Sequence, residues 1–241
     1  MSGGFGAEVI WHDVECASYT ADLPLWEELA ADSGEVLDLG CGTGRVALHL
    51  ARRGHDVIGL DHDATLLKAL SERGDGLSVE PVHADIREFE LDRQVPLALA
   101  PMQTLQLLEG PADRLACLRR VAATLAPGGR FAAAILEEMP PPDDSPPPLP
   151  DVREVDGWVY SSLAVEAAVG PGEIIIRRRR QTVSPGGELS EEPNRVRIAT
   201  FPAAQLEKEA ARVGLAPVER RRIEPTEIHV GSTVVLLEAE G

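Results

Sequence analysis

Apolar and polar positions between residues 35 and 136 follow two alternating patterns. Short apolar runs of strand length are followed by longer amphipathic runs that end at glycine or at a Pro-Gly-Gly turn. The strands are expected at 35–39, 55–61, 77–85, 95–101 and 130–136, and the helices at 44–54, 62–74 and 113–129. Because strands that alternate with helices form right-handed crossovers, this pattern predicts a parallel sheet covered by helices on both faces.

The pattern changes after residue 136. Residues 139–150 contain seven prolines in twelve positions, which excludes a helix or a central strand and predicts an extended linker or lid loop. The strand-like runs that follow are separated by turn signals and lie at 158–169, 173–184 and 194–201. Such successive hairpins predict an inserted antiparallel cap over residues 151–200. After the cap we expect a helix at 202–214 and strands at 215–224 and 231–240.

Three glycines at alternate positions, Gly40, Gly42 and Gly44, stand between the first strand and the first helix. Parallel α/β sheets bind ligands at the carboxyl ends of their strands, and glycines let the backbone turn tightly and approach a ligand closely. A dinucleotide-binding turn would need a third glycine where this chain has Arg45, and no Gly-Lys-Ser/Thr follows. The spacing therefore excludes both an NAD site and a nucleotide-binding P-loop.

The net charge of the chain limits the kinds of partner that it can bind. The chain has 241 residues and a formal net charge of −17, which argues against duplex nucleic acid and anionic membrane surfaces as partners. The longest run of basic residues, 177–180, lies in a predicted strand, so its side chains alternate between the two faces. We expect these arginines to pair with the abundant acidic residues rather than to bind RNA.

The cysteines and the hydropathy of the chain indicate in which cellular compartment to expect the protein. Cys16, Cys41 and Cys117 are widely spaced, without a CxxC pair, which predicts neither a disulfide framework nor a zinc site and fits a reducing environment. The histidines show no metal-binding spacing, so no metal is expected. No apolar run approaches 18 residues, and the N-terminus lacks the features of a signal peptide. We therefore expect a cytoplasmic protein.

The segment VLDLGCGTG resembles motif I of the class I S-adenosylmethionine-dependent methyltransferases. The resemblance continues, in order, through VIGLDHD, VHADIREFEL, ALAPMQTLQLL and LRRVAATLAPGGRF, and it covers residues 35–136. It implies a Rossmann-like, doubly wound seven-stranded sheet whose last strand is antiparallel, and S-adenosyl-L-methionine as the cofactor. The inserted cap resembles that of small-molecule N-methyltransferases of the glycine and amino-sugar types.

The resemblance implies roles for four residues around the cofactor. Asp61, at the end of the second strand, would accept hydrogen bonds from both ribose hydroxyls; the alternative is a surface acid that contributes little to the core. Asp85 would accept from the adenine amine while Ile86 covers the ring, or Asp85 is simply a turn or N-cap residue. Asp38 would orient the methionine ammonium end of the cofactor.

Other positions are less specific. His62 would flank the adenine or is a surface histidine, and Cys41 fits the glycine turn by its size rather than by its nucleophilicity. The backbone of Ala100 or Pro101 would take the methionine ammonium group. The complete set of cofactor-binding candidates is Asp38, Gly40, Cys41, Gly42, Gly44, Asp61, His62, Asp85, Ile86, Ala100 and Met102.

The acceptor side offers two candidate catalytic residues, Tyr19 and Gln103. Met102 and Gln103 follow the fourth strand, where this family places acceptor-facing residues, and Gln103 would orient an amine or hydroxyl without acting as a base. Tyr19 lies in WHDVECASYTADLPLW, which resembles the N-terminal lid of such enzymes, and would cover the sulfonium or the acceptor. The sequence APMQ lacks the Asn/Asp-Pro-Pro-Tyr motif of enzymes that methylate amides or nucleic-acid bases.

The expected function is methyl transfer to a small-molecule acceptor, at nitrogen by preference. The sulfonium is already activated, so positioning the acceptor in line would suffice, without a strong base. The alternatives are a non-catalytic sensor that binds the cofactor or its product, and a methyltransferase for protein or RNA. We expect a monomer or homodimer. The expected division is a helical lid at 1–34, a cofactor-binding core at 35–136, the linker and cap at 137–200, and the final core elements at 201–241.

Overall fold

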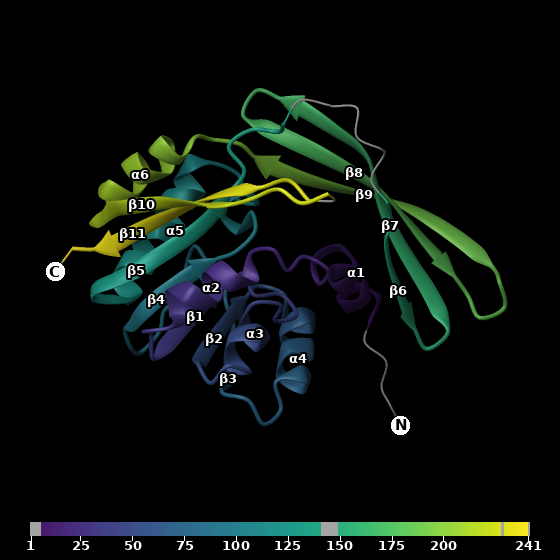
Figure 1. The fold of residues 1–241 in the computed structure, drawn as a ribbon, viewed down its shortest axis with the longest axis horizontal. Coiled ribbons are helices and arrows are strands. Elements are labelled where there is room, and N and C mark those ends of the chain that lie inside the picture. Colours follow the sequence, from purple (N-terminus) through teal and green to yellow (C-terminus); the bar gives the residue numbers. More distant parts are fainter. Residues whose placement is uncertain (1–5, 141–148, 228, 241) are drawn as a thin grey trace.

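The computed structural model describes residues 6–140, 149–227 and 229–240, which form two sheets with helices around the larger one (Figure 1). The helices are α1 (Ala7–Cys16), α2 (Leu23–Ala30), α3 (Ala47–Ala51), α4 (Ala64–Arg73), α5 (Pro111–Thr124) and α6 (Ala203–Ala211), with a 3₁₀ turn, η1 (Thr104–Gln106). The core strands are β1 (Glu35–Leu39), β2 (Asp56–Asp61), β3 (Val79–His83), β4 (Val95–Ala100), β5 (Leu125–Ile135), β10 (Leu215–Ile223) and β11 (Ser232–Ala239). The second sheet contains β6 (Asp151–Val155), β7 (Trp158–Gly170), β8 (Glu173–Val183) and β9 (Leu189–Ala199).

The larger sheet has seven strands in the order β10-β11-β5-β4-β1-β2-β3. Strands β1 to β5 pair in parallel, whereas β11 is antiparallel to both β5 and β10. This arrangement confirms the predicted Rossmann-like sheet with an antiparallel last strand. The carboxyl ends of β1, β2 and β4 therefore lie at one edge of the sheet, where a ligand is expected.

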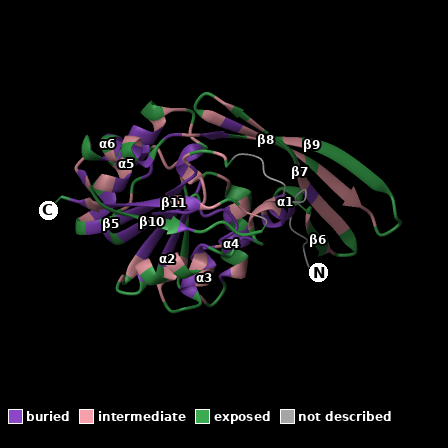
Figure 2. Ribbon diagram, turned by 45° about the horizontal axis from the view of Figure 1, so that its top comes forward, coloured by how far each residue is buried: buried purple, intermediate pink, exposed green. Residues whose placement is uncertain are grey.

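Helices cover both faces of this sheet because its strands are apolar on both sides. Val36 of β1 packs with residues of α2, α3 and α4, whereas its neighbours Leu37 and Leu39 pack with α5 and α6. The inner strands β1, β2, β4, β5 and β11 are mostly buried, whereas the edge strands β3 and β10 and the second sheet are largely half-buried or exposed (Figure 2). No described helix is long and apolar enough to cross a membrane.

Element boundaries differ from the expected ones at several places. Strand β9, expected at 194–201, is Leu189–Ala199. The helix expected at 44–54 is an α-helix only over Ala47–Ala51, because the glycine turn extends to residue 46. The helix expected to end at the Pro-Gly-Gly turn ends at Thr124, and the turn residues belong to the start of β5, whose pairing with β4 shifts register there. Strand β6 was not expected. Residues 141–148 of the proline-rich linker lie outside the described residues.

The second sheet is a meander in which β6, β7, β8 and β9 pair antiparallel in chain order, which confirms the predicted hairpins. Helix α1 lies between this sheet and the core (Figure 1). The indole of Trp11 meets the ring of Tyr160 edge-on, with centroids 5.3 Å apart. The four-stranded sheet therefore covers α1 and the adjoining edge of the core, and we call it the cap.

The four consecutive arginines in β8 alternate as predicted. Arg180 pairs with Glu15 of α1, on the core-facing side of the cap, and Arg177 pairs with Glu166 of β7. Arg178 pairs with Asp151 at 3.3 Å and Arg179 with Glu191 at 4.0 Å, so the predicted pairing with acidic residues is confirmed for all four. Arg178 also faces the core, and it is considered further below.

A buried ion pair between α5 and α6 provides a stability test. Arg114 donates to Glu209 at 3.0 and 2.8 Å, and the guanidinium lies 4.0 Å from the centroid of the Phe201 ring. Arg114→Ala leaves the Glu209 carboxylate buried without its counterion, so we expect a loss of about 3–5 kcal/mol in the free energy of unfolding, measured by urea denaturation. Arg221→Ala, which removes an exposed pair with Glu28, serves as the control and should change stability little. Equal losses in the two variants would contradict this account.

Candidate functional site

The turn after β1 is built on left-handed glycines. Gly40, Gly42 and Gly44 have φ angles of 67°, 54° and 93°, a region that costs other residues free energy. At Gly42 the space is also closed: a Cβ would stand 2.3 Å from Nε2 of His12, on α1. Conformation and close packing therefore both require glycine at position 42.

Asp61 holds this turn against the end of β2. Its carboxylate accepts hydrogen bonds from the backbone amides of Gly42, at 2.8 Å, and Asp63, at 2.9 Å. The residue is only 6% exposed, so the interpretation of Asp61 as a surface acid with little structural role is wrong. Each oxygen accepts one hydrogen bond from a backbone amide. Since a carboxylate oxygen has a second lone pair, each can also accept a hydrogen bond from a ligand hydroxyl.

Asp38, in β1, is the most unusual group in the site. It is 1% exposed, and neither carboxylate oxygen has a hydrogen-bond partner among the described residues. Burial raises the pKa of Asp38 to about 7, against the opposing effects of the Arg45 guanidinium and of the nearby Ala47 backbone amide, which does not meet hydrogen-bond geometry. Buried polar groups are almost always hydrogen-bonded, so an unpartnered carboxylate of this kind points to a ligand that supplies donors.

A cavity of about 310 Å³ opens at this point. Four parts of the chain form its walls: α1, the glycine turn, the segment after β4, and the cap strands β8 and β9. Its lining residues are His12, Glu15, Cys16, Asp38, Gly40, Cys41, Arg45, Val46, Pro101, Met102, Gln103, Thr104, Leu107, Ile176, Arg178, Val196 and Ile198. The cavity has the size of a small-molecule site.

Five of the predicted site residues line this cavity: Asp38, Gly40, Cys41, Met102 and Gln103. Met102 has a φ of 54°, a strained conformation for a bulky residue that often marks a functional position. The Gln103 side-chain amide donates to Ser232 at 3.4 Å. The Cys41 thiol is buried beside Gly59, and burial raises its pKa far above the usual range, which agrees with a steric role.

Tyr19 and Ala100 are buried and are not among the residues that line the cavity. The Tyr19 ring meets His229 edge-on, with centroids 4.9 Å apart, and the Arg45 guanidinium lies 5.2 Å from its centroid. Burial raises the pKa of Tyr19 to about 12. The catalytic role assigned to Tyr19 stays a prediction.

The predicted adenine-binding residues also lie outside the cavity lining, after β2 and β3. The His62 side chain is 84% exposed. Asp85 receives a two-pronged contact from Arg87, whose hydrogen bonds lower the pKa of the carboxyl below its ordinary value. Ile86 is half-buried against the core. An adenine amine would therefore share Asp85 with Arg87, and these three roles stay predictions.

Three residues of α1 form part of the site without having been predicted. Burial lowers the pKa of His12, which favours the neutral imidazole. Asp13 accepts from the Thr43 hydroxyl at 2.8 Å and from Arg73 at 2.9 and 2.6 Å, so it joins α1 to the glycine turn and to α4. Glu15 accepts from Arg180 at 2.8 and 2.9 Å and thus joins α1 to the cap. All three lie in WHDVECASYTADLPLW, the segment that resembles an N-terminal lid, where only Tyr19 was assigned a role.

The described residues contain no group of three or more His, Cys, Asp or Glu side chains placed to hold a metal ion. The expectation that the protein needs no metal stays a prediction.

Residues 36–129 match the family model described as a methyltransferase domain. The chain is therefore similar to methyltransferases over its core, from β1 to the start of β5. Among solved structures, S-adenosylmethionine-bound CalS10, an amino pentose methyltransferase from Micromonospora echinaspora, superposes on it with a TM-score of 0.71. That match covers 99% of each chain at 17% sequence identity, so it shows a shared fold that includes the cap.

Curated relatives of the methyltransferase domain match over shorter segments. The cypemycin N-terminal methyltransferase of a Streptomyces species is 34% identical over 98 residues, which are 41% of this chain and 40% of that protein. The dTDP-3-amino-3,6-dideoxy-alpha-D-glucopyranose N,N-dimethyltransferase of Streptomyces fradiae is 32% identical over 97 residues, 40% of this chain and 37% of that protein. The match thus spans less than half the length of these curated relatives.

Substitution at Gly42 tests the packing of α1 on the turn. Gly42→Ala adds a Cβ in the left-handed region, which costs about 1–2 kcal/mol, and forces it against the His12 ring. The free energy of unfolding, from urea denaturation, should fall by more than the strain alone. Gly76→Ala is the matched control, because Gly76 has a φ of 77° and open space around it.

The His12→Ala background separates the two effects. There the cost of Gly42→Ala should approach that of Gly76→Ala, because the ring is gone. An identical cost of Gly42→Ala with and without His12 would show that the ring does not cover the turn.

Proposed function

We propose that this protein is an S-adenosylmethionine-dependent methyltransferase that methylates a nitrogen atom of a small-molecule acceptor. The observation that carries the proposal is the buried, unpartnered carboxylate of Asp38, which opens into the cavity beside the glycine turn. An ammonium group is the ligand that such a carboxylate would bind, and the amino-acid end of the cofactor has one.

The residues present fit this cofactor at two further points. Asp61 is fixed by two backbone amides and has lone pairs left for the ribose hydroxyls. The glycine turn has no side chain at Gly40 or Gly42, so its backbone is open to close approach. When bound, the cofactor supplies a methyl group already activated on sulfur.

The contribution of the chain is to position the acceptor and exclude water. Apolar residues of the cap line the site opposite the glycine turn, and Gln103, after β4, can orient an amine through its side-chain amide. His12, at the wall formed by α1, is held as the neutral imidazole, because burial lowers its pKa, and it adds no positive charge to the site. Holding a neutral amine in line in this way is the main requirement of the reaction.

The names of the matched proteins favour nitrogen as the acceptor atom, since two of those described above are an N-terminal methyltransferase and a sugar N,N-dimethyltransferase. All three cysteines are unpaired, which supports the cytoplasm as the compartment. We retain the expectations of a monomer or homodimer and of no nucleic-acid or membrane partner.

The proposal is tested by methyl transfer. Purified protein with methyl-labelled S-adenosylmethionine should label at least one compound in a panel of nucleotide-linked amino sugars, amino acids and short peptides. Asp38→Ala should lose cofactor binding and transfer, and Asp32→Ala, at an exposed acid, should keep both. Cofactor binding without any transfer would favour the sensor alternative, and transfer only to protein or RNA would overturn the small-molecule acceptor. Absence of cofactor binding would refute the proposal altogether.

Cofactor affinity should depend on pH through Asp38. Its pKa of about 7, raised by burial, means that the carboxyl is largely protonated at pH 6, when it cannot hold an ammonium group as an ion pair. The affinity for S-adenosylhomocysteine should therefore fall by about tenfold from pH 8 to pH 6, with proton release on binding near pH 7. Calorimetry in buffers of different ionisation enthalpy measures both.

Two variants show whether Asp38 is the group that releases the proton. Asp38→Asn should bind more weakly at pH 8 and lose the pH dependence, whereas His12→Gln, at another titratable group of the cavity lining, should retain it. Wild-type affinity that does not change between pH 6 and pH 8 would contradict the role of Asp38.

A further inference from the structure

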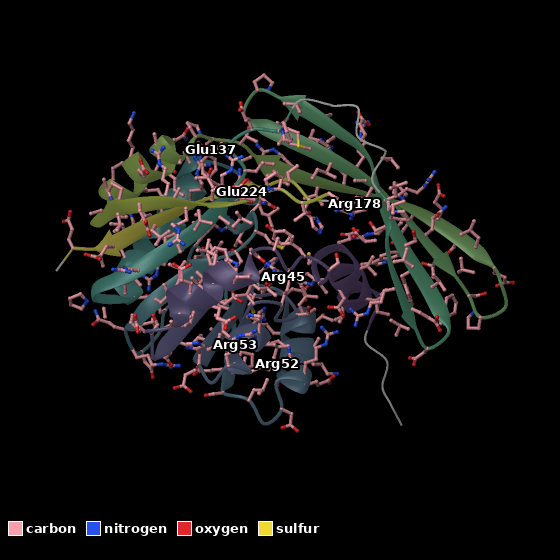
Figure 3. The ribbon with its side chains drawn as sticks, viewed as in Figure 1. Arg45, Arg52, Arg53, Glu137, Arg178 and Glu224 are labelled. Atoms are coloured by element: carbon pink, nitrogen blue, oxygen red, sulfur yellow. The ribbon has the colours of Figure 1, made fainter. Side chains whose placement is uncertain are left out.

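Arg178 of β8 is a charged group in the cavity whose guanidinium is only partly engaged by the fold, through one ion pair with Asp151 at 3.3 Å. It lies on the core-facing side of the cap, two residues from Arg180, and it lines the same cavity as Asp38. Figure 3 shows Arg178 between the cap and the core, with Arg45 on the core side of the same region. Its side chain is only 19% exposed.

The hydrogen-bonding capacity of Arg178 is largely unused, in contrast to that of its neighbours. Arg180 donates from Nε and Nη2 to Glu15 at 2.8 and 2.9 Å, and Arg45 donates from two nitrogens to Asp22 at 2.6 and 2.7 Å. Arg178 donates from Nη1 alone, to Asp151 and Ser162, both at 3.3 Å. Its Nε and Nη2 have no hydrogen-bond partner among the described residues.

The other charges around the cavity are already neutralised or are assigned to the cofactor. Glu15 is paired with Arg180, Arg45 with Asp22, and Asp38 is available to the cofactor ammonium. On the cap side, Arg178 is surrounded by the apolar residues Ile176, Val196 and Ile198. This wall therefore presents an apolar surface and one planar cation with free donors.

A guanidinium with two adjacent free nitrogens binds carboxylate or phosphate oxygens in a two-pronged geometry. We propose that the acceptor is an anionic small molecule, and that Arg178 binds its carboxylate or phosphate group while the amine lies toward Gln103. This inference rests on the proposed function, since it concerns the acceptor of that same site. It makes Arg178 a determinant of acceptor specificity, and it assigns that role to the cap.

The test measures anion binding directly. Protein saturated with S-adenosylhomocysteine is titrated with inorganic pyrophosphate and, separately, with succinate, and binding is followed by calorimetry. At least one anion should bind the wild type at millimolar concentration, and Arg178→Gln should weaken it at least tenfold. Arg179→Gln, at the adjacent half-exposed arginine that is absent from the cavity lining, is the matched control and should bind as the wild type does.

Comparison of the two titrations identifies the anionic group of the acceptor. Tighter binding of pyrophosphate indicates a phosphorylated acceptor, and tighter binding of succinate indicates a carboxylated one. Arg178→Gln should bind S-adenosylhomocysteine as tightly as the wild type does, which would show that the variant affects the acceptor site and not the cofactor site.

If the wild-type protein does not bind S-adenosylhomocysteine, the proposed function fails, but the same anion titrations on the free protein still test the role of Arg178. If Arg178→Gln does not fold, Arg178→Lys is used instead. It keeps the positive charge but lacks the two adjacent N–H donors of the guanidinium, so it should also weaken anion binding. No anion binding by the wild type, or equal binding by Arg178→Gln, overturns the inference.

Discussion

The hydrogen bond from the Gly42 amide to the Asp61 carboxylate fixes the geometry on which the rest of the site depends. Gly42 reaches the end of β2 because the chain turns back through left-handed glycines directly after β1. The amides of Gly40 and Cys41 also donate to the carbonyl of Leu60, at 2.8 and 3.0 Å, so the pairing of β1 with β2 continues beyond the strand end. Two carboxylates, Asp38 and Asp61, are thereby brought to one edge of the sheet.

Helix α1 depends on this turn and on the cap at once. Asp13 takes hydrogen bonds from Thr43, in the turn, and from Arg73 of α4, while Glu15 takes them from the cap. Burial opposes the ionisation of Asp13, but its hydrogen bonds from Arg73 and Thr43 outweigh this and lower the pKa of the carboxyl. Buried ion pairs give little net stability, so we interpret these contacts as fixing where α1 lies between its two neighbours.

Much of the core was predictable from sequence because periodicity and turn chemistry are local. The glycine turn, Asp38 and Asp61 follow from one short segment and the next strand. The boundary of α5 was not predictable, since the Pro-Gly-Gly residues join β5 through a register shift that depends on β4. The exposed-acid interpretation of Asp61 failed for a similar reason: sequence shows that an acid ends the strand, but not that two amides lie against it.

The features of the site that could not be predicted from the sequence are contacts between segments that are far apart along the chain. His12 is 30 residues from Gly42 along the chain, yet its ring lies over that glycine, and nothing in the helix pattern indicates this contact. Arg178 was predicted to alternate with its neighbours, but whether it pairs or stays open depends on where Asp151 and Ser162 stand on the adjoining strands. Propensity and spacing carry no such information.

Charge is divided between the two walls of the cavity in a way that follows from the fold. The core contributes the unpartnered carboxylate of Asp38, whereas the cap contributes the incompletely bonded guanidinium of Arg178. The two groups stand on separate sheets. A change of acceptor can therefore be accommodated by substitutions in the cap strands, which leave the glycine turn and its contact with Asp61 unaltered, so cofactor binding and acceptor choice can vary independently in this architecture.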